Sequence, residues 1–280
     1  MEFRPSVQGM RGDEGDRDEV LEPRIKYFVA TVIPVVILCG GKGTRMRAGR
    51  ERLPKPLVEI GGRPILWHVM SLYAAQGFVR FILLLGYGAE RVRAFAAGAE
   101  GHWDITCLDT GRDTPTGGRV HRAASLLGDG TFMLTYADGL ADIGFQELLR
   151  RHREHGGAAT ITVVRPTNPW GVAQLGEDGR IGGFVEKPRL ECWVNGGFMV
   201  MEPRALELIG PDDVLEREPL EALAGRGELF SYRHDGFWDC MDTYKDTLLL
   251  NDLWERGEAP WRLGADPAPP VEQPAASRPR

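Results

Sequence analysis

Short apolar runs alternate with helical patterns along the chain from Pro34 to about Pro166. The apolar runs have the length of strands, and their nearly continuous hydrophobicity is typical of parallel strands that are covered on both faces. The expected strands are PVVILCG, VRFILLLG, DITCLDT, TFMLTYADG and AATITVVRP. Helical patterns such as PILWHVMSLYAAQG and IGFQELLRRHREHG lie between them. This alternation predicts an α/β fold with a doubly wound, mostly parallel sheet and right-handed crossovers.

The pattern changes after about Trp170, where strand-like segments become more frequent. WGVAQLGEDGRIGGFVEKP predicts a β-hairpin with its turn at Asp178-Gly179, and CWVNGGFMVMEP predicts a further strand. Helical patterns follow in ALELIG, EREPLEALAGRG and TYKDTLLLNDLWERG, with the strand-like ELFSYRHDGFWDCMDT before the last of them. We therefore expect one domain over residues 34–262. Its β-rich half, residues 166–262, adds mixed sheet to the half formed by residues 34–165.

The two ends of the chain lack the periodicity of a folded domain. The N-terminal stretch mixes charged residues with glycine, and the C-terminal stretch GADPAPPVEQPAASRPR is rich in proline and alanine. We expect a disordered leader or extra segment over residues 1–33 and a disordered tail over residues 263–280. The start lacks the apolar core of a secretory signal, and no apolar stretch approaches the ~20 residues of a membrane helix. No membrane partner is therefore expected.

Charge and cysteine content narrow the classes of function. The formal net charge of −6 offers no broad basis for binding nucleic acid. The four cysteines are scattered, without the spacing of a zinc site or a disulfide framework, which is typical of a cytoplasmic protein. Cys39 and Cys107 lie in strand-like runs, where a buried structural thiol is expected.

Three loops that follow expected strands contain the residue types of a ligand site. Ligands of doubly wound sheets bind outside the carboxyl ends of the strands, where LCGG, LDTG and TYADG should lie. The first of these continues as GGKGTRM, from Gly40 to Met46. It lacks the third glycine of a dinucleotide fingerprint and the spacing of a P-loop. Its glycines either form a tight turn or let backbone N–H groups approach an anion, and Thr44 and Arg45 favour the anion site.

A lysine shortly downstream lies between two prolines. Pro54 and Pro56 should hold the backbone of Lys55 stiff and extended, so its ammonium would be a positioned point charge. A lysine in such a loop can also be an ordinary solvated residue. The preceding glycine and arginine loop favours a phosphate contact.

Taken together, these motifs resemble the sugar-1-phosphate nucleotidyltransferases, and among them most of all the glucose-1-phosphate cytidylyltransferases. The resemblance rests on LCGGKGTR followed by PKPLVEIG, and on LDTGRDTPTGGRV, TFMLTYADGLAD, FVEKP, VNGGFMV, EREPLEALA and YRHDGFWDCMDTYKD. It extends from about Pro34 to Trp261 and implies a glycosyltransferase-A-like version of the predicted sheet.

The resemblance implies that an NTP and a sugar 1-phosphate react to give a nucleotide sugar and pyrophosphate. No general base is needed, because a phosphate monoester is already anionic near neutral pH. The resemblance assigns Arg45 and Lys55 to catalysis, and Asp138 and Asp242 to Mg²⁺. Two carboxylates plus substrate phosphates are a common way of holding this ion. The implied nucleotide-binding residues are Leu38, Cys39, Gly40, Gly41, Lys42, Gly43, Thr44, Arg45, Lys55, Thr114, Thr116, Gly117, Arg119 and Ala137.

The sugar phosphate is assigned to the second half of the domain. The implied residues are Tyr136, Trp170, Gly171, Glu186, Lys187, Asn195 and Gly196. Each has an ordinary alternative: Glu186 and Lys187 could form a solvated pair, and Tyr136 and Trp170 could pack in the core. The metal assignment has alternatives as well, since Asp138 and Asp242 could cap helices or turns, and Asp142 and Asp239 lie close by.

The chain also departs from the family pattern. Leu53 stands where relatives often have the first lysine of KPKP, and Ala137 replaces a glycine beside Asp138. The segment FAAGAEGHWD is short, which bears on nucleotide choice and on the homo-oligomer that the resemblance implies. The main hypothesis is CTP and glucose 1-phosphate. Another NTP or sugar, a nucleotide-sugar-binding module without catalysis, and more distantly a dinucleotide-dependent oxidoreductase are the alternatives.

Overall fold

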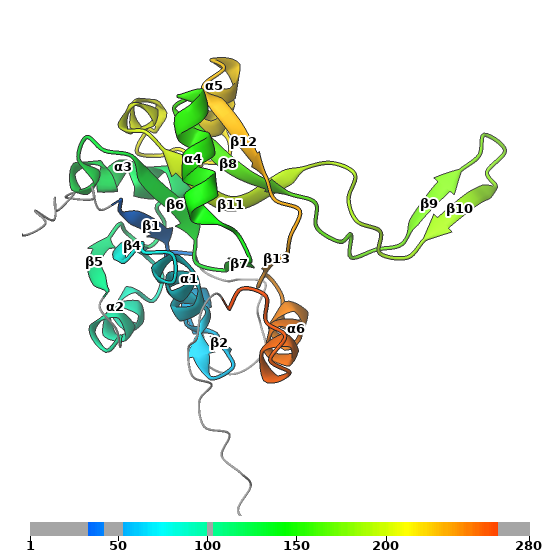
Figure 1. The fold of residues 1–280 in the computed structure, drawn as a ribbon, viewed down its shortest axis with the longest axis horizontal. Helices are drawn as coiled ribbons and strands as arrows, with labels where there is room; N and C mark the ends of the chain where they lie inside the picture. Colours follow the sequence, from blue (N-terminus) through cyan, green and yellow to red (C-terminus); the bar gives the residue numbers. More distant parts are fainter. Residues whose placement is uncertain (1–32, 42–52, 100–102, 263–280) are drawn as a thin grey trace, which may run out of the picture. The chain divides into compact units, whose positions relative to one another are not determined.

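A seven-stranded mixed sheet lies at the centre of the computed structural model, which describes residues 33–41, 53–99 and 103–262 (Figure 1). The strand order is β12-β8-β11-β6-β1-β4-β5. Four neighbouring strands are parallel: β1 (Val35–Leu38), β4 (Arg80–Leu85), β5 (Asp104–Asp109) and β6 (Phe132–Tyr136). The other three are β8 (Ala159–Val164), β11 (Val194–Met201) and β12 (Leu229–Arg233). β11 runs antiparallel between β6 and β8, so both predicted halves share one sheet.

Alternate residues of each central strand enter two hydrophobic clusters, one on each face of the sheet. Val35 and Ile37 of β1 pack in one cluster, and Val36 and Leu38 pack in the other. The first cluster is covered by α1 (Ile65–Ala74), α2 (Ala89–Ala97), α4 (Phe145–His155) and α6 (Tyr244–Glu255). The second is covered by α3 (Thr116–Leu127), the 3-10 helix η2 (Pro203–Leu208) and α5 (Glu218–Gly225). Burial on both faces accounts for the continuous apolar runs in the sequence.

Within the described residues, three small two-stranded sheets accompany the central one. They are formed by β2 (Glu59–Ile60) with β3 (Arg63–Pro64), β7 (Gly139–Ala141) with β13 (Trp238–Cys240), and β9 (Val172–Leu175) with β10 (Ile181–Val185). The β7–β13 pair matters for the site, because it joins the chain after β6 to a segment near the C-terminus.

The β9–β10 hairpin extends away from the central sheet as an arm (Figure 1). Its turn lies at the predicted place, with Gly179 in the left-handed region at φ +79°. All four residues of β9 are exposed, and Leu175 on it is 75% exposed. An isolated two-stranded hairpin is only marginally stable in water. Packing against the hydrophobic core of the described chain therefore does not stabilise the arm.

The structure confirms the predicted mixed, mostly parallel sheet with helices on both faces. Of ALELIG, expected to be helical, the residues from Ala205 to Leu208 lie in the 3-10 helix η2 (Pro203–Leu208). The predicted disordered ends lie outside the described residues. None of the helices within the described ranges is both long and apolar enough to cross a membrane.

Candidate active site

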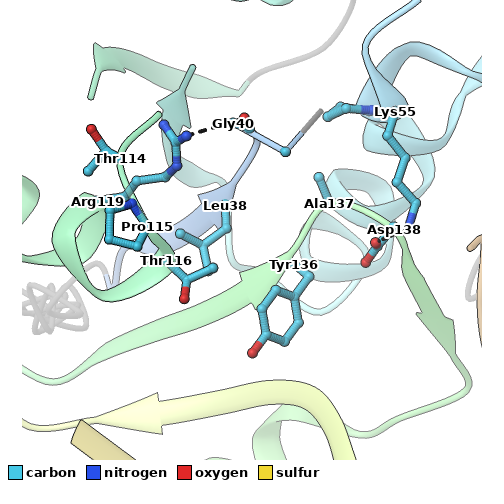
Figure 2. Close-up of a pocket in the computed structure, with 12 residues that line it drawn as sticks. Leu38, Gly40, Lys55, Thr114, Pro115, Thr116, Arg119, Tyr136, Ala137 and Asp138 are labelled. Atoms are coloured by element: carbon cyan, nitrogen blue, oxygen red, sulfur yellow. Dashed lines mark hydrogen bonds and ion pairs between the residues drawn. The ribbon is translucent and has the colours of Figure 1, made fainter. Parts of the chain in front are cut away.

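A pocket opens at the carboxyl ends of β1 and β6, where the sequence predicted a ligand site (Figure 2). Lys55 and Asp138 stand at one end of it, and the segment from Thr114 to Thr116 stands at the other. The lining residues are Leu38, Gly40, Gly41, Lys55, Pro56, Thr114, Pro115, Thr116, Arg119, Tyr136, Ala137 and Asp138. Most of the residues assigned to the nucleotide therefore lie around one cavity.

One ammonium group joins two carboxylates at the charged end of the site. The Nζ atom of Lys55 lies 2.6 Å from Oδ2 of Asp138 and 2.5 Å from Oδ1 of Asp242. Burial lowers the pKa of Lys55, but the two carboxylates outweigh it, and the pKa lies above its ordinary value. Lys55 therefore stays charged, and it brings together the two aspartates that were assigned to the metal.

The backbone at Lys55 differs from the expected extended form. Lys55 begins the 3-10 helix η1 (Lys55–Leu57), with backbone N–H groups of Leu57 and Val58 donating to the carbonyls of Pro54 and Lys55. Pro56 suits this turn because its ring presets φ near the value that the turn needs. The prediction of an extended backbone was wrong, whereas the positioned charge that it was meant to explain is present.

Asp242 is held at the start of α6. Its backbone N–H donates to Oδ2 of Asp246, which also forms a capping box with Thr243. The Cys240 thiol lies 3.7 Å from Oδ2 of Asp242, and burial raises the pKa of that thiol. The β7–β13 pair then sets Asp242 beside Asp138, because Met241 N donates to the Asp138 carbonyl at 2.9 Å.

The two neighbouring acids lie in different surroundings. Asp142 pairs with Nε2 of His234 at 2.9 Å. Asp239 accepts from the backbone N–H of Cys240, and burial raises its pKa to about 6. In the described part of the chain, neither acid bonds to Lys55. Asp142 and Asp239 are thus not part of the ion pairs that Lys55 forms with Asp138 and Asp242.

Arg119 is buried beside Gly40 and connects several segments at the carboxyl ends of the strands. The residue is 5% exposed, and its side chain donates to oxygens at the end of β4 and in the segments that follow β1 and β5. The acceptors are the carbonyls of Gly40, Leu85, Gly111 and Arg112 and the hydroxyl of Thr110. A Cβ on Gly40 would lie 2.1 Å from the guanidinium carbon of Arg119, so a larger residue there would displace the guanidinium. Arg119 therefore adds positive charge beside Gly40.

The sugar-side residues fall into two groups. Asn195 and Gly196 lie beside Tyr136: the Asn195 amide reaches the Tyr136 hydroxyl at 3.5 Å, and the Gly196 carbonyl accepts from Trp238. Gly197, at φ +85°, leaves room for the Tyr136 ring, since a Cβ would lie 2.6 Å from it. The second group, Trp170, Gly171, Glu186 and Lys187, flanks the two strands of the exposed arm and is not among the residues that line the pocket.

Some assigned residues cannot contribute a side chain to the pocket, and some lie outside the described residues. The Cys39 thiol is fully buried in the core, which raises its pKa and agrees with the structural interpretation. Gly117 packs beneath the segment before α5. Lys42, Gly43, Thr44 and Arg45 are among the residues that the structure does not describe.

Sequence reasoning missed one polar residue that connects the two ends of the pocket. Glu216 accepts hydrogen bonds from the hydroxyls of Tyr136 and Thr116. It lies in EREPLEALA, a motif that the sequence analysis quoted without giving any of its residues a role. An acid just before a predicted helix usually signals a cap, so the sequence carries no local sign of a contact with residues 80 and 100 positions away.

Comparison with known proteins places this chain in a family. The sequence profile of the nucleotidyl transferase family matches residues 34–225. The chain belongs to the nucleotidyl transferase family. A relative from Bacillus subtilis, named probable glucose-1-phosphate cytidylyltransferase, is 41% identical over 81% of this chain and 98% of its own length. The glucose-1-phosphate cytidylyltransferase of Salmonella typhi is 38% identical over the same shares.

Solved structures extend the family assignment to the fold. HddC from Yersinia pseudotuberculosis superposes with a TM-score of 0.64 at 20% identity, over 79% of this chain and 99% of that one. A putative glucose-1-phosphate thymidylyltransferase from Bacillus anthracis gives a TM-score of 0.62 at 16% identity, over 79% of this chain and 94% of that one. At such identities the likeness concerns the fold alone, and it agrees with the predicted glycosyltransferase-A-like sheet of this nucleotidyl transferase.

Proposed function

We propose that this chain joins CTP and α-D-glucose 1-phosphate to give CDP-glucose and pyrophosphate. The observation that carries the proposal is the convergence of Lys55, Asp138 and Asp242 at one end of a pocket in a nucleotidyl transferase fold. The choice of substrates is supported by the two relatives at 41% and 38% identity that bear the name glucose-1-phosphate cytidylyltransferase.

The chemistry is a direct displacement at the α-phosphorus of the nucleotide. A phosphate oxygen of glucose 1-phosphate forms the new P–O bond, while the bond from the α-phosphorus to the bridging oxygen of the pyrophosphate breaks. The pyrophosphate leaves with the electron pair, and no proton has to be removed from the nucleophile, which is already anionic near neutral pH. The protein must align two polyanions and stabilise the charge that develops.

The residues at the charged end suit this task. Two aspartates hold the ammonium of Lys55 in one position. The group is therefore preorganised for a contact with the phosphates. The backbone of Gly40 and Gly41 lines the same cavity and can approach a phosphate closely. In the proposal Arg45 faces the leaving pyrophosphate, and Lys42, Gly43 and Thr44 complete the phosphate loop.

The two aspartates fit a magnesium ion. Their oxygens already converge on one cation, the ammonium of Lys55, at 2.6 and 2.5 Å. Carboxylate oxygens are the ligands that Mg²⁺ prefers, and substrate phosphates and water can complete its shell. The described residues contain no cluster of three or more His, Cys, Asp or Glu side chains placed for a metal, so the protein's share would be small. When bound, Mg²⁺ would neutralise charge on the triphosphate.

We further propose a homo-oligomer in which the arm packs against a second copy of the chain. Ile181 lies opposite Leu175, and Phe184 lies opposite Ala173, so these side chains form one apolar face of the hairpin. Leu175, Ile181 and Phe184 are 75%, 61% and 63% exposed, which is unusual for residues of this kind.

The arm also carries the residues assigned to the sugar phosphate. Lys187 has a left-handed backbone at φ +48°, a rare conformation for lysine that is typically kept at functional positions. Neither Lys187 nor Glu186 is among the residues that line the pocket of the same chain. In the proposal, the arm of one copy brings them to the sugar side of another copy's pocket, near Asn195 and Gly196.

The remaining proposals concern domains and location. We propose one catalytic domain over residues 34–262, with a nucleotide-binding half to residue 165 and a sugar-binding half from residue 166. The partners are small molecules, without nucleic acid or membrane. All four cysteines lie in the described part of the chain and are free, which supports a cytoplasmic enzyme.

The substrate assignment predicts the outcome of a matrix assay. Pyrophosphate release is measured for CTP, UTP, ATP, GTP and dTTP, each with glucose 1-phosphate and with mannose 1-phosphate. We expect CTP with glucose 1-phosphate to give the highest kcat/KM, by about tenfold or more over each alternative. A comparable kcat/KM for another nucleotide or sugar phosphate would change the substrate assignment but leave the proposed class of reaction intact. Binding without turnover in every combination would indicate a module without catalysis.

The metal assignment predicts different effects at four acids. Asp138→Asn and Asp242→Asn should each lose most Mg²⁺-dependent turnover, because a neutral amide holds the metal poorly and no side chain replaces the charge that the metal supplies. Asp142→Asn and Asp239→Asn are the matched controls, and they should keep most of the activity. Turnover is measured against Mg²⁺ concentration, and thermal midpoints establish that the variants are folded. An essential Asp142 or Asp239 would show that the metal is misplaced. Unchanged turnover in all four variants would refute the proposed nucleotidyl transfer itself.

The arm proposal predicts that association depends on the apolar face. Phe184→Asp should dissociate the oligomer and lower kcat/KM for the sugar 1-phosphate more than for CTP, since a charge on the face opposes burial. Leu126→Asp introduces the same charge at a partly exposed position on α3, and it should leave the oligomer and the kcat/KM values unchanged. Sedimentation velocity and initial rates provide the readouts. A wild-type protein that stays monomeric at micromolar concentration would contradict the proposal.

A further inference from the structure

Glu216 joins the two walls of the pocket through hydroxyl groups. Oε1 of Glu216 accepts from the Tyr136 hydroxyl at 2.5 Å, and Oε2 accepts from the Thr116 hydroxyl at 2.7 Å. Tyr136 ends β6, and Thr116 begins α3. Both residues line the pocket, and Glu216 belongs to the segment before α5. One side chain thus binds the hydroxyl groups of two pocket residues.

The carboxylate decides which role these hydroxyls can play. A carboxylate only accepts hydrogen bonds, so the protons of both hydroxyls point toward Glu216. The Thr116 oxygen also accepts from the backbone N–H of Leu215 at 2.9 Å. The Tyr136 oxygen also accepts from the side-chain amide of Asn195 at 3.5 Å. Toward the pocket, the two hydroxyls therefore offer lone pairs and no proton.

The backbone holds Glu216 in place. The N–H of Gly118 donates to the carbonyl of Asp213 at 3.1 Å, which joins the first turn of α3 to the segment before α5. A Cβ on Gly117 would lie 2.7 Å from the Asp213 carbonyl oxygen, and one on Gly118 would lie 2.1 Å from that of Pro211. The two glycines let the chain segments approach closely, which fixes the backbone of the segment that carries Glu216.

We propose that Glu216 is a positioning residue that makes the Tyr136 and Thr116 hydroxyls hydrogen-bond acceptors, so that the pocket selects a nucleoside with a donor at this place. The inference rests on the proposed use of CTP and deepens it, and it gives Tyr136, which the resemblance assigned to the sugar phosphate, a contact with the nucleoside. Cytidine carries two donors of this kind, the exocyclic amine of the base and the hydroxyls of the ribose. UTP replaces the amine with a carbonyl oxygen, and 2′-deoxy-CTP lacks one hydroxyl, so the two analogues distinguish the sources.

The test is the substitution Glu216→Gln, which keeps the size of the side chain. The new amide has one accepting oxygen and one donating NH₂ group, so one hydroxyl must reverse and turn its proton toward the pocket. Dissociation constants of CTP, UTP and 2′-deoxy-CTP are measured by titration calorimetry, with kcat/KM for each at saturating glucose 1-phosphate. Glu216→Ala, which frees both hydroxyls, is the second variant. Glu221→Gln, an exposed acid on α5, is the matched control.

We expect the wild type to bind CTP about tenfold or more tightly than the analogue that lacks the donor. In Glu216→Gln and Glu216→Ala this preference should fall to about threefold or less, with most of the loss on CTP, while Glu221→Gln keeps it. Thermal midpoints should stay near that of the wild type, because Glu216 is an exposed residue.

Two outcomes would overturn the inference. Equal weakening for all three nucleotides would mean that Glu216 only braces the pocket, and an unchanged preference would mean that it has no role in selection. Failure of the proposed function looks different, since the wild type would then release no pyrophosphate from CTP. The titrations do not depend on turnover, so the binding preference still decides for or against Glu216 in that case.

Discussion

The ammonium of Lys55, held between Asp138 and Asp242, is the interaction on which the rest of the site depends. The three residues lie 83 and 187 positions apart in sequence, so they meet only when the whole domain has folded. Two carboxylates this close would repel each other without a cation between them. The lysine therefore stabilises the pair of carboxylates before any substrate or metal binds. The same contacts hold its ammonium where we propose that the phosphates bind.

Several features of the fold serve this meeting of charges. The β7–β13 pair connects the end of β6 to the start of α6, and the capping box of Thr243 fixes the first turn of that helix. On the other side of the pocket, the buried Arg119 donates to the backbone carbonyls of Gly40, Leu85 and Gly111, and so connects the carboxyl ends of β1, β4 and β5. A buried guanidinium with five oxygen acceptors is costly to replace, because any shorter donor leaves carbonyls unpaired.

Local pattern was enough to predict much of this architecture. Apolar runs marked the parallel strands, and the glycine, proline and acid motifs at their ends marked the residues that line the pocket. Contacts between distant segments could not be predicted in the same way. The 3-residue strand β7 carries no periodicity, and the insertion of β11 between β6 and β8 depends on packing across the whole sheet. The position of the arm and the contacts of Glu216 likewise leave no local trace in the sequence.

The most direct test of the account is the turnover number of Lys55→Ala. A charge-assisted contact to a developing anion is worth about a hundredfold or more in rate, so kcat should fall by at least that factor while the domain stays folded. Lys245→Ala removes an exposed ammonium from the first turn of α6 and provides the control. Near-wild-type turnover by the Lys55 variant, with the control also unaffected, would contradict the claim that this lysine organises the transfer of the nucleotidyl group.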